Sequence, residues 1–140
     1  MNEPDLPHLL LTAYRSLGDE IEAALRDRGV SDLRPSLAAA LLLVDRTGTR
    51  LTELATRAGI TKQAMMQMVD ELQSLGCVRR VPDPVDSRAK VVRLTARGLR
   101  HRAAARKSIQ AVESRVKRWL GDRRYEALRI ILAELTQAEE

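Results

Sequence analysis

The stretch that most constrains this chain is residues 51–95, which read as a helix, a tight turn, a second helix and a basic β-hairpin. The first helix is expected over residues 51–57. Gly59 lies where the chain must reverse, and glycine adopts the positive φ of such a turn without steric cost. Thr61 is then placed to cap the second helix, expected over residues 62–75. A helix, a short glycine-containing turn and another helix form a helix-turn-helix.

The second of these helices has two chemically different faces. One face carries apolar side chains at the i, i+3, i+4 and i+7 spacing that predicts packing against a core. These side chains are Met65, Met68, Val69 and Leu72. The outward-facing residues are Lys62, Gln63, Met66, Gln67 and Asp70. Taken alone, this pattern is equally typical of an ordinary amphipathic surface helix, so its meaning depends on the segment after Gly76, the glycine expected to end the helix.

The segment after Gly76 has the pattern of a hairpin. Two short runs rich in valine, residues 77–81 and 91–94, flank a stretch that contains two prolines and two aspartates. Both residue types disfavour strand and favour turns. The pattern therefore predicts two strands joined by a long tip that carries Arg88 and Lys90. A basic hairpin directly after a helix-turn-helix is called a wing.

With the wing in place, the chain resembles a known family. The segment from Gly76 to Gly98 is similar to the wing signature of the MarR family of bacterial transcriptional regulators. The matching positions, in chain order, are Gly76, Arg80, Asp83-Pro84, Asp86-Ser87-Arg88, Lys90 and Leu94-Thr95-Ala96-Arg97-Gly98. The motif is long and ordered, which makes chance agreement improbable.

The resemblance implies a fold that is mainly α with a small β-hairpin wing. One domain would span residues 1–140, with a winged helix-turn-helix DNA-binding unit at residues 35–95 and dimerisation helices at residues 6–29 and 99–138. Family members often carry Arg in the middle of the recognition helix, where this sequence has Gln67. The family's usual operator sequence is therefore not carried over to this chain.

The rest of the chain reads as helices. Apolar periodicity predicts them over residues 7–28, 36–46, 96–120 and from Asp122 onward. The second is apolar over most of its circumference and is the expected core helix, and a short strand at residues 50–51 is expected to pair with the wing. The first and last helices are amphipathic and lie outside the winged unit. Pairing with a twofold mate would bury their apolar faces, and the resemblance implies such a homodimer; folding back on their own winged unit is the alternative.

The net charge of +5 is concentrated in one part of the chain. Residues 79–107 hold ten Lys and Arg against two Asp, a local net charge of +8, whereas acidic residues outnumber basic ones over residues 1–34. This clustering favours a nucleic-acid partner over a generally basic surface. A membrane surface is a weaker interpretation, because the segment lacks an interleaved apolar and aromatic face.

The composition also bears on the compartment. The longest apolar run, residues 37–44, is too short to span a membrane. A single cysteine excludes an internal disulfide framework. Acidic residues precede the first apolar run, which is unlike a signal peptide. A cytoplasmic protein with no membrane partner is the simplest interpretation.

The sequence offers no arrangement of residues suited to catalysis. His8 and His101 lie in different helices without a nearby pattern of metal ligands. Asp83 and Asp86 lie on a basic hairpin tip, a poor place to raise a carboxyl pKa for acid–base chemistry. We therefore expect no catalytic residue, no metal and no cofactor. Cys77 occupies an apolar position, so a buried structural cysteine is favoured over a redox sensor.

The expected DNA contacts come from the recognition helix and the wing. They are Thr61, Lys62, Gln63, Met66, Gln67, Arg80, Arg88 and Lys90. Glutamine can pair bidentately with adenine, and Met66 can touch a thymine methyl group. The resemblance implies that Arg88 enters the minor groove. Phosphate would repel Asp86, so we assign Asp86 an orienting role toward a basic wing side chain, either Arg88 or Arg80.

The expected function is that of a homodimeric repressor on a palindromic operator, released by a small-molecule or stress signal. The resemblance implies an effector cleft between the dimer helices and the winged unit. It would be lined by the basic helix expected over residues 96–120 and by Tyr14, Leu17, Leu37 and Leu41. Packing against neighbouring helices is the competing interpretation for Tyr14. Two other functions fit the sequence: an architectural DNA-binding protein with little sequence preference, and a winged-helix module that binds proteins.

Overall fold

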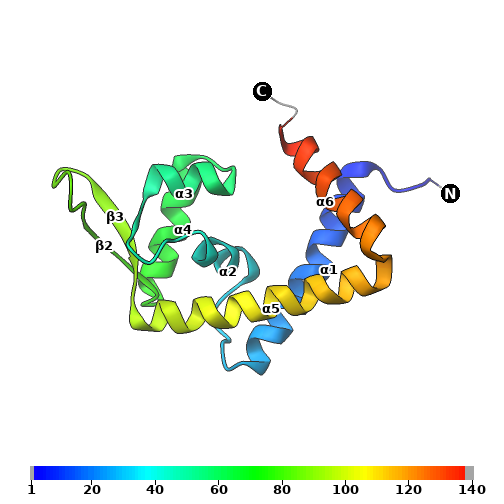
Figure 1. Ribbon diagram of the computed structural model, residues 1–140, viewed down its shortest axis with the longest axis horizontal. Helices are drawn as coiled ribbons and strands as arrows, with labels where there is room; N and C mark the ends of the chain where they lie inside the picture. The colour runs from blue at the N-terminus through cyan, green and yellow to red at the C-terminus, as the bar shows by residue number, and fades with distance from the viewer. Residues whose placement is uncertain (1, 138–140) are drawn as a thin grey trace.

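The computed structural model describes residues 2–137 and has the predicted order of helices and strands. Its elements are α1 (Leu6–Asp27), α2 (Pro35–Leu42), β1 (Thr49–Arg50), α3 (Leu51–Ala58), α4 (Lys62–Ser74), β2 (Val78–Pro82), β3 (Lys90–Leu94), α5 (Ala96–Leu120) and α6 (Asp122–Gln137). Figure 1 shows the winged unit at one end of the long helix α5 and the pair α1 and α6 toward the other end. The fold is therefore mainly α with a small β-hairpin wing, as predicted.

The helix-turn-helix is confirmed at its turn. Gly59 follows α3 with a φ of 68°, the left-handed conformation expected there. The Thr61 side chain accepts a hydrogen bond from the N–H of Ala64 at 3.0 Å and so caps α4. Gly76, with a φ of 75°, follows the other end of α4. The recognition helix is therefore delimited by local signals at both ends.

The end of α2 differs from the prediction. The helix was expected to reach residue 46 but ends at Leu42, although Val44 remains buried in the core. Two contacts favour the earlier turn: the N–H of Asp45 donates to the Thr49 hydroxyl at 2.9 Å, and the Arg57 guanidinium donates to the Leu43 carbonyl at 2.7 Å. Apolar periodicity overestimated the helix because a residue can be buried without being helical.

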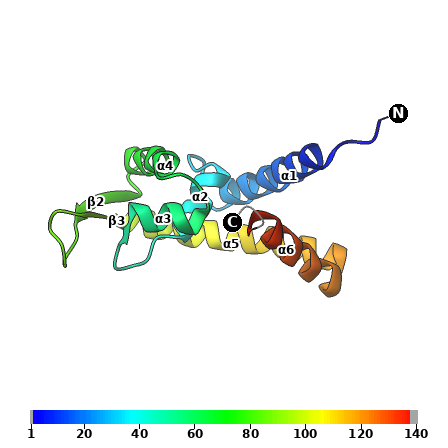
Figure 2. The same cartoon turned by 90° about the horizontal axis from the view of Figure 1, so that it is seen from above.

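The three strands form one antiparallel sheet in the order β1-β3-β2. Val78 pairs with Leu94 at the base of the wing and Pro82 pairs with Lys90 toward its tip. The short first strand lies one residue earlier than predicted, with Thr49 opposite Val92, because Leu51 already begins α3. Viewed from above, the wing projects at the end of the molecule opposite α1 and α6 (Figure 2).

The glycine that closes the wing motif has a packing role. Gly98 lies in the first turn of α5, where a Cβ atom would overlap the carbonyl oxygen of Cys77. In the same corner, the Thr95 hydroxyl donates to the Gly76 carbonyl and accepts from the N–H of Gly98. The Leu-Thr-x-x-Gly pattern therefore holds the start of α5 directly against the chain that leaves α4.

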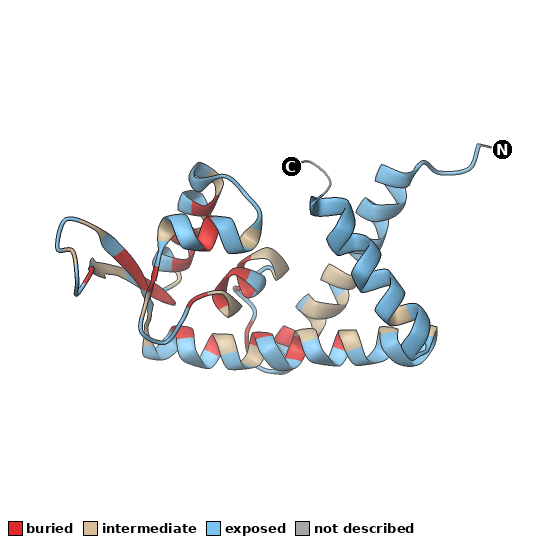
Figure 3. Ribbon diagram, turned by 45° about the horizontal axis from the view of Figure 1, so that its top comes forward, coloured by how far each residue is buried: buried red, intermediate tan, exposed pale blue. Residues whose placement is uncertain are grey.

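The hydrophobic core lies within the winged unit and the adjoining parts of α1 and α5. Among its fully buried side chains are Leu25, Leu41, Leu54, Met65, Leu72 and Val78. Figure 3 shows buried residues gathered in this part of the molecule, whereas α6 is exposed along almost its whole length. No helix among residues 2–137 is both long enough and apolar enough to span a membrane.

Candidate nucleic-acid interface

The outer face of α4 is polar and accessible. Met65, Val69 and Leu72 anchor the helix in the core, as predicted. On the opposite side Lys62, Gln63, Met66 and Gln67 are all exposed. An apolar Met66 that is 42% exposed is available for contact with another molecule. Because the inner face is fixed by packing, the position of this outer face relative to the rest of the unit is fixed as well.

Arg80 joins the wing to the recognition helix. Its guanidinium donates to the Asp70 carboxylate at 2.6 Å and to the Gln73 side-chain oxygen at 2.8 Å, both on α4. The sequence suggested Arg80 as a DNA contact, but the structure engages its guanidinium with the protein. Arg80 thus positions the wing relative to α4.

The tip of the wing carries an accessible arginine. The Arg88 side chain is 91% exposed, and its Nε donates to the Asp86 carboxylate at 3.2 Å. The same carboxylate oxygen accepts the N–H of Arg88 at 3.1 Å. The sequence left the partner of Asp86 open between Arg88 and Arg80, and the structure pairs it with Arg88. Such an exposed pair adds little stability but biases where the guanidinium lies.

Asp83 holds the base of the tip, a role that sequence reasoning missed. Its carboxylate is largely buried and accepts the N–H of Val85 at 2.8 Å and the Nε of Arg50 at 2.8 Å. The hydrogen bond from Val85, followed by that from Arg50, lowers the pKa of Asp83. An aspartate before a proline is a recognisable turn signal, but its partner Arg50 lies on another strand and could not be found from the sequence.

A second charged cluster fastens α5 to the loop before α2. Arg97 donates to Asp32 at 2.7 Å, and a ring nitrogen of His101 lies 3.2 Å from the other oxygen of the same carboxylate. Burial raises the pKa of Asp32, but the hydrogen bonds from Arg97 and His101 outweigh it and the pKa is lowered. Nearby Cys77 is fully buried, and burial raises the pKa of its thiol. A buried thiol of this kind suits packing better than redox chemistry.

The structure does not bring the four side chains named for the predicted effector cleft together around one space. Leu37 and Leu41 are buried in the core, whereas Tyr14 is 60% exposed on α1. Only Leu17 borders a large apolar cavity, of about 720 Å³, together with Trp119 and Ile131 between α1, α5 and α6. The helical pattern correctly placed these residues on helices but could not show which of them face a common space.

Within residues 2–137, no three His, Cys, Asp or Glu side chains are grouped so that they could hold a metal ion. The titratable residues that do cluster, such as Asp32 with Arg97 and Asp83 with Arg50, are paired with arginines. Their geometry serves to join elements of the winged unit.

A reading helix with an accessible outer face, held beside a hairpin with an arginine at its tip, defines a winged helix-turn-helix protein of the kind that binds nucleic acid. Comparison with known proteins narrows this class: the chain belongs to the MarR family of transcriptional regulators, as its wing motif indicated. The family's sequence profile, described as "MarR family", matches residues 31–89. The HTH-type transcriptional repressor Rv2887 of Mycobacterium tuberculosis is 30% identical over 115 residues, which cover 82% of this chain and 81% of that protein.

Solved structures agree with this assignment. CouR from Rhodococcus jostii RHA1, bound to p-coumaroyl-CoA, has a TM-score of 0.77 and 26% identity, and the match covers 94% of this chain and 92% of that one. The transcriptional repressor CouR bound to a 23-mer DNA duplex has a TM-score of 0.76 and 28% identity, and the match again covers 94% of this chain and 92% of that one. The chain therefore has the fold of regulators whose structures include complexes with DNA and with a small molecule.

Proposed function

We propose that the protein is a homodimeric repressor that binds a palindromic DNA operator in the cytoplasm, acting by binding rather than by catalysis. The observation that carries this proposal is the pairing of two accessible groups on one rigid unit: the outer face of α4 and Arg88 at the wing tip. The Arg80–Asp70 contact holds the helix and the hairpin together. A solved relative with this fold, CouR, is bound to a DNA duplex.

In this proposal α4 reads bases in the major groove. Gln63 and Gln67 are exposed and can pair with adenine, while Met66 offers a methyl group to thymine. Thr61 and Lys62 stand at the helix N-terminus, where backbone N–H groups and a cation favour a phosphate. The helix would then be positioned by phosphate contacts and would select its site by base contacts.

The wing reads the adjacent minor groove. A narrow minor groove concentrates negative potential, and a planar guanidinium sheds water more readily than an ammonium group. Arg88 has the exposure this requires, and Asp86 restrains it through the hydrogen bond at 3.2 Å. Lys90, exposed at the start of β3, would meet the phosphate backbone.

A second copy of the chain is the partner proposed for the terminal helices. Exposed large apolar side chains on α1 include Leu6, Leu9, Leu10 and Leu11, and those on α6 include Leu128, Ile131 and Leu135. Trp119, at the end of α5, is 76% exposed beside them. The opposite end of α1 belongs to the core through Leu25, so the proposed dimer surface uses the N-terminal half of α1 only.

A small molecule is the proposed signal that releases the operator. CouR, which resembles this chain over nearly its whole length, is bound to p-coumaroyl-CoA in one solved structure. A ligand that favours one orientation of the two winged units would change the spacing of the recognition helices, which must match successive major grooves.

Selection of bound fragments from genomic DNA, followed by gel-shift titration of the recovered site, tests the proposal. We expect the operator to bind far more tightly than random DNA, and affinity to fall steeply with salt because phosphate contacts release counterions. An operator-to-random ratio near one would indicate an architectural protein instead. Unchanged migration of every duplex at low salt would indicate a module that binds proteins.

A further inference from the structure

A basic cavity lies at the junction of the wing, the end of α2 and α5. Its volume is about 780 Å³, within the usual range for small-molecule sites. The cationic residues that line it are Arg46, Arg93, Arg102, Arg106 and Lys107. Apolar lining comes from Leu94, Leu99 and Ala103, and no lining residue is acidic. None of these residues belongs to α4 or to the wing tip, and Tyr14, Leu17, Leu37 and Leu41 do not line this cavity.

Within residues 2–137, the cations of this cavity form no ion pairs, whereas several other arginines in or beside the winged unit do. Arg34, Arg57 and Arg97 each form an ion pair with a nearby carboxylate. Among the described residues, no carboxylate lies within ion-pair distance of the five lining cations. Asp45, the neighbour of Arg46, is held by Arg57 at 3.0 Å.

Arg102 makes the imbalance sharper. Its Nε atom is buried and has no hydrogen-bond partner among residues 2–137. Buried polar atoms are nearly always paired, and a buried donor on a permanently charged group is costly to leave without an acceptor. Arg102 therefore holds its positive charge at the wall of the cavity without a compensating acceptor at Nε.

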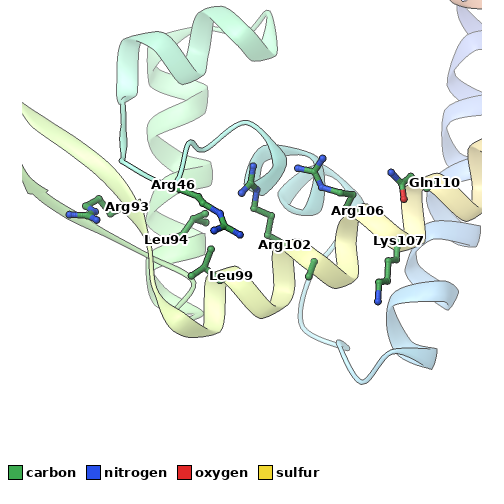
Figure 4. Close-up of a pocket in the computed structure, with 9 residues that line it drawn as sticks. Arg46, Arg93, Leu94, Leu99, Arg102, Arg106, Lys107 and Gln110 are labelled. Atoms are coloured by element: carbon green, nitrogen blue, oxygen red, sulfur yellow. The ribbon is translucent and has the colours of Figure 1, made fainter.

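Three of the cationic side chains point into the same space. Figure 4 shows Arg46, Arg102 and Arg106 extending into the space between α5 and the chain that follows α2, with Leu94 and Leu99 at its wing end. Arg93 and Lys107 lie at its margins. Arg102 and Arg106 are one helical turn apart, about 6 Å along the axis of α5. Three guanidinium groups and an apolar end thus face one volume.

We propose that this cavity binds a small amphipathic dianion, a phosphate monoester attached to an apolar or aromatic body. A single carboxylate would offset one of three converging charges, whereas a phosphate carries up to two charges and presents three oxygens to guanidinium groups that bind such oxygens in pairs. The apolar body would lie against Leu94 and Leu99.

Ligand binding in this cavity can alter DNA binding, and this part of the inference rests on the proposed repressor function. Arg93 and Leu94 belong to β3 and Arg46 follows α2, so both sides of the winged unit border the cavity, while Arg102 and Arg106 belong to α5. A dianion held between them favours one placement of the winged unit on α5. If that placement differs from the DNA-bound one, the ligand lowers operator affinity.

Isothermal titration of the full-length protein with three matched probes tests the site. The probes are 1-naphthyl phosphate, 1-naphthoate and 1-naphthol, which share the apolar body and differ in charge. We expect 1-naphthyl phosphate to bind about tenfold more tightly than 1-naphthoate, and 1-naphthol to bind most weakly. The double variant Arg102→Gln/Arg106→Gln should weaken phosphate-probe binding by at least about tenfold. The matched control is Arg100→Gln on the exposed side of the same helix, which should change the affinity by less than about twofold.

Two further measurements distinguish a ligand site from a set of DNA phosphate contacts. In the absence of probe, the double variant should bind DNA within about threefold of the parent, whereas loss of about tenfold would make these arginines DNA phosphate contacts and overturn the proposal. Equal binding of the three probes, or undiminished phosphate binding by the double variant, would also overturn it. Should the double variant unfold, Arg106→Gln alone, at an exposed position, carries the test. Direct probe binding remains measurable even if no operator is found.

Discussion

The winged unit and the terminal helices differ in how much of their apolar surface is buried. In the winged unit Leu54, Met65 and Leu72 are almost completely enclosed by their own chain. In the terminal region Ile131 and Leu135 are exposed on α6, which contains no buried residue within the described range. The winged unit has a complete core, and the terminal helices present an apolar surface that only another molecule can cover.

The boundary between these two regions runs through helices and not between them. Leu25, near the end of α1, is part of the core, while Leu6 and Leu9 at its start are exposed. In the same way the first half of α5 buries Ala105 and Ser108, and its last turn exposes Trp119. The single helix α5 therefore connects the proposed dimer surface to the winged unit, so that a shift of one moves the other, which suits a regulator.

Replacing Gly98 by alanine is expected to have the largest effect, because the new Cβ would overlap the Cys77 carbonyl and force α5 away from the wing. We expect a loss of about 4 kcal/mol or more in unfolding free energy, measured by denaturant titration. Gly121→Ala is the control from the terminal region: its Cβ meets open space, so only the backbone conformation, with φ 82° and ψ 159°, opposes it, at about 1–3 kcal/mol. Similar losses in both variants would contradict this contrast.

Substitution of a buried and of an exposed aliphatic residue should have different effects. Leu72→Ala leaves a cavity in the winged unit and should cost about 2–5 kcal/mol at any protein concentration. Ile131→Asp should leave the unfolding of the winged unit nearly unchanged and shift the monomer–dimer equilibrium, as seen by analytical ultracentrifugation. An Ile131→Asp protein that stays dimeric at micromolar concentration would place the dimer surface elsewhere.

The wing should show a change of affinity without a change of stability. Each protomer of a dimer contributes one Arg88, so Arg88→Ala should cost about 2–6 kcal/mol in operator binding, and Arg88→Lys should recover part of it. Asp86→Ala should also weaken binding, because it frees the guanidinium that Asp86 restrains. Simple electrostatics predicts the opposite sign. Tighter operator binding by Asp86→Ala in a gel-shift titration would show that Asp86 has no orienting role.

The recognition face should give smaller, position-specific effects. Gln63→Ala, Met66→Ala or Gln67→Ala should each relax selectivity by about 1–3 kcal/mol at the base pair it contacts, with the fold unchanged because all three are exposed. The measurement is affinity for a set of operators, each carrying one substituted base pair. If discrimination persists at every position in all three variants, base reading belongs to other residues.

The smallest effect concerns pH and the base of the wing. Because folding lowers the pKa of Asp83 below its unfolded value of about 3.9, ionised Asp83 stabilises the wing above that pH, and the stabilisation is lost as the pH falls through the folded pKa. Asp83→Asn should therefore lower stability at neutral pH and reduce the acid sensitivity. Unfolding midpoints at pH 3 and pH 7 test this, and equal shifts at both values would contradict it.

Much of the structure of the winged unit could be predicted from the sequence because its signals are local. Gly59, Thr61 and Gly76 set the turn and the ends of α4, and the spacing of Met65, Val69 and Leu72 oriented it. The wing motif indicated the family, and the apolar faces of α1 and α6 pointed to a partner. Each of these inferences needs only the residues of one element or of its immediate neighbours.

Only the tertiary structure decided which distant side chains meet. It paired Arg80 with Asp70 and Asp86 with Arg88, ended α2 at Leu42, and buried Leu37 and Leu41 in the core. It also brought Arg46 and Arg102 to one cavity from separate elements. Helical periodicity gives the face of a residue on its own helix, but the partner of that face depends on how all the helices pack together. A site assembled from several elements is therefore determined by the fold as a whole.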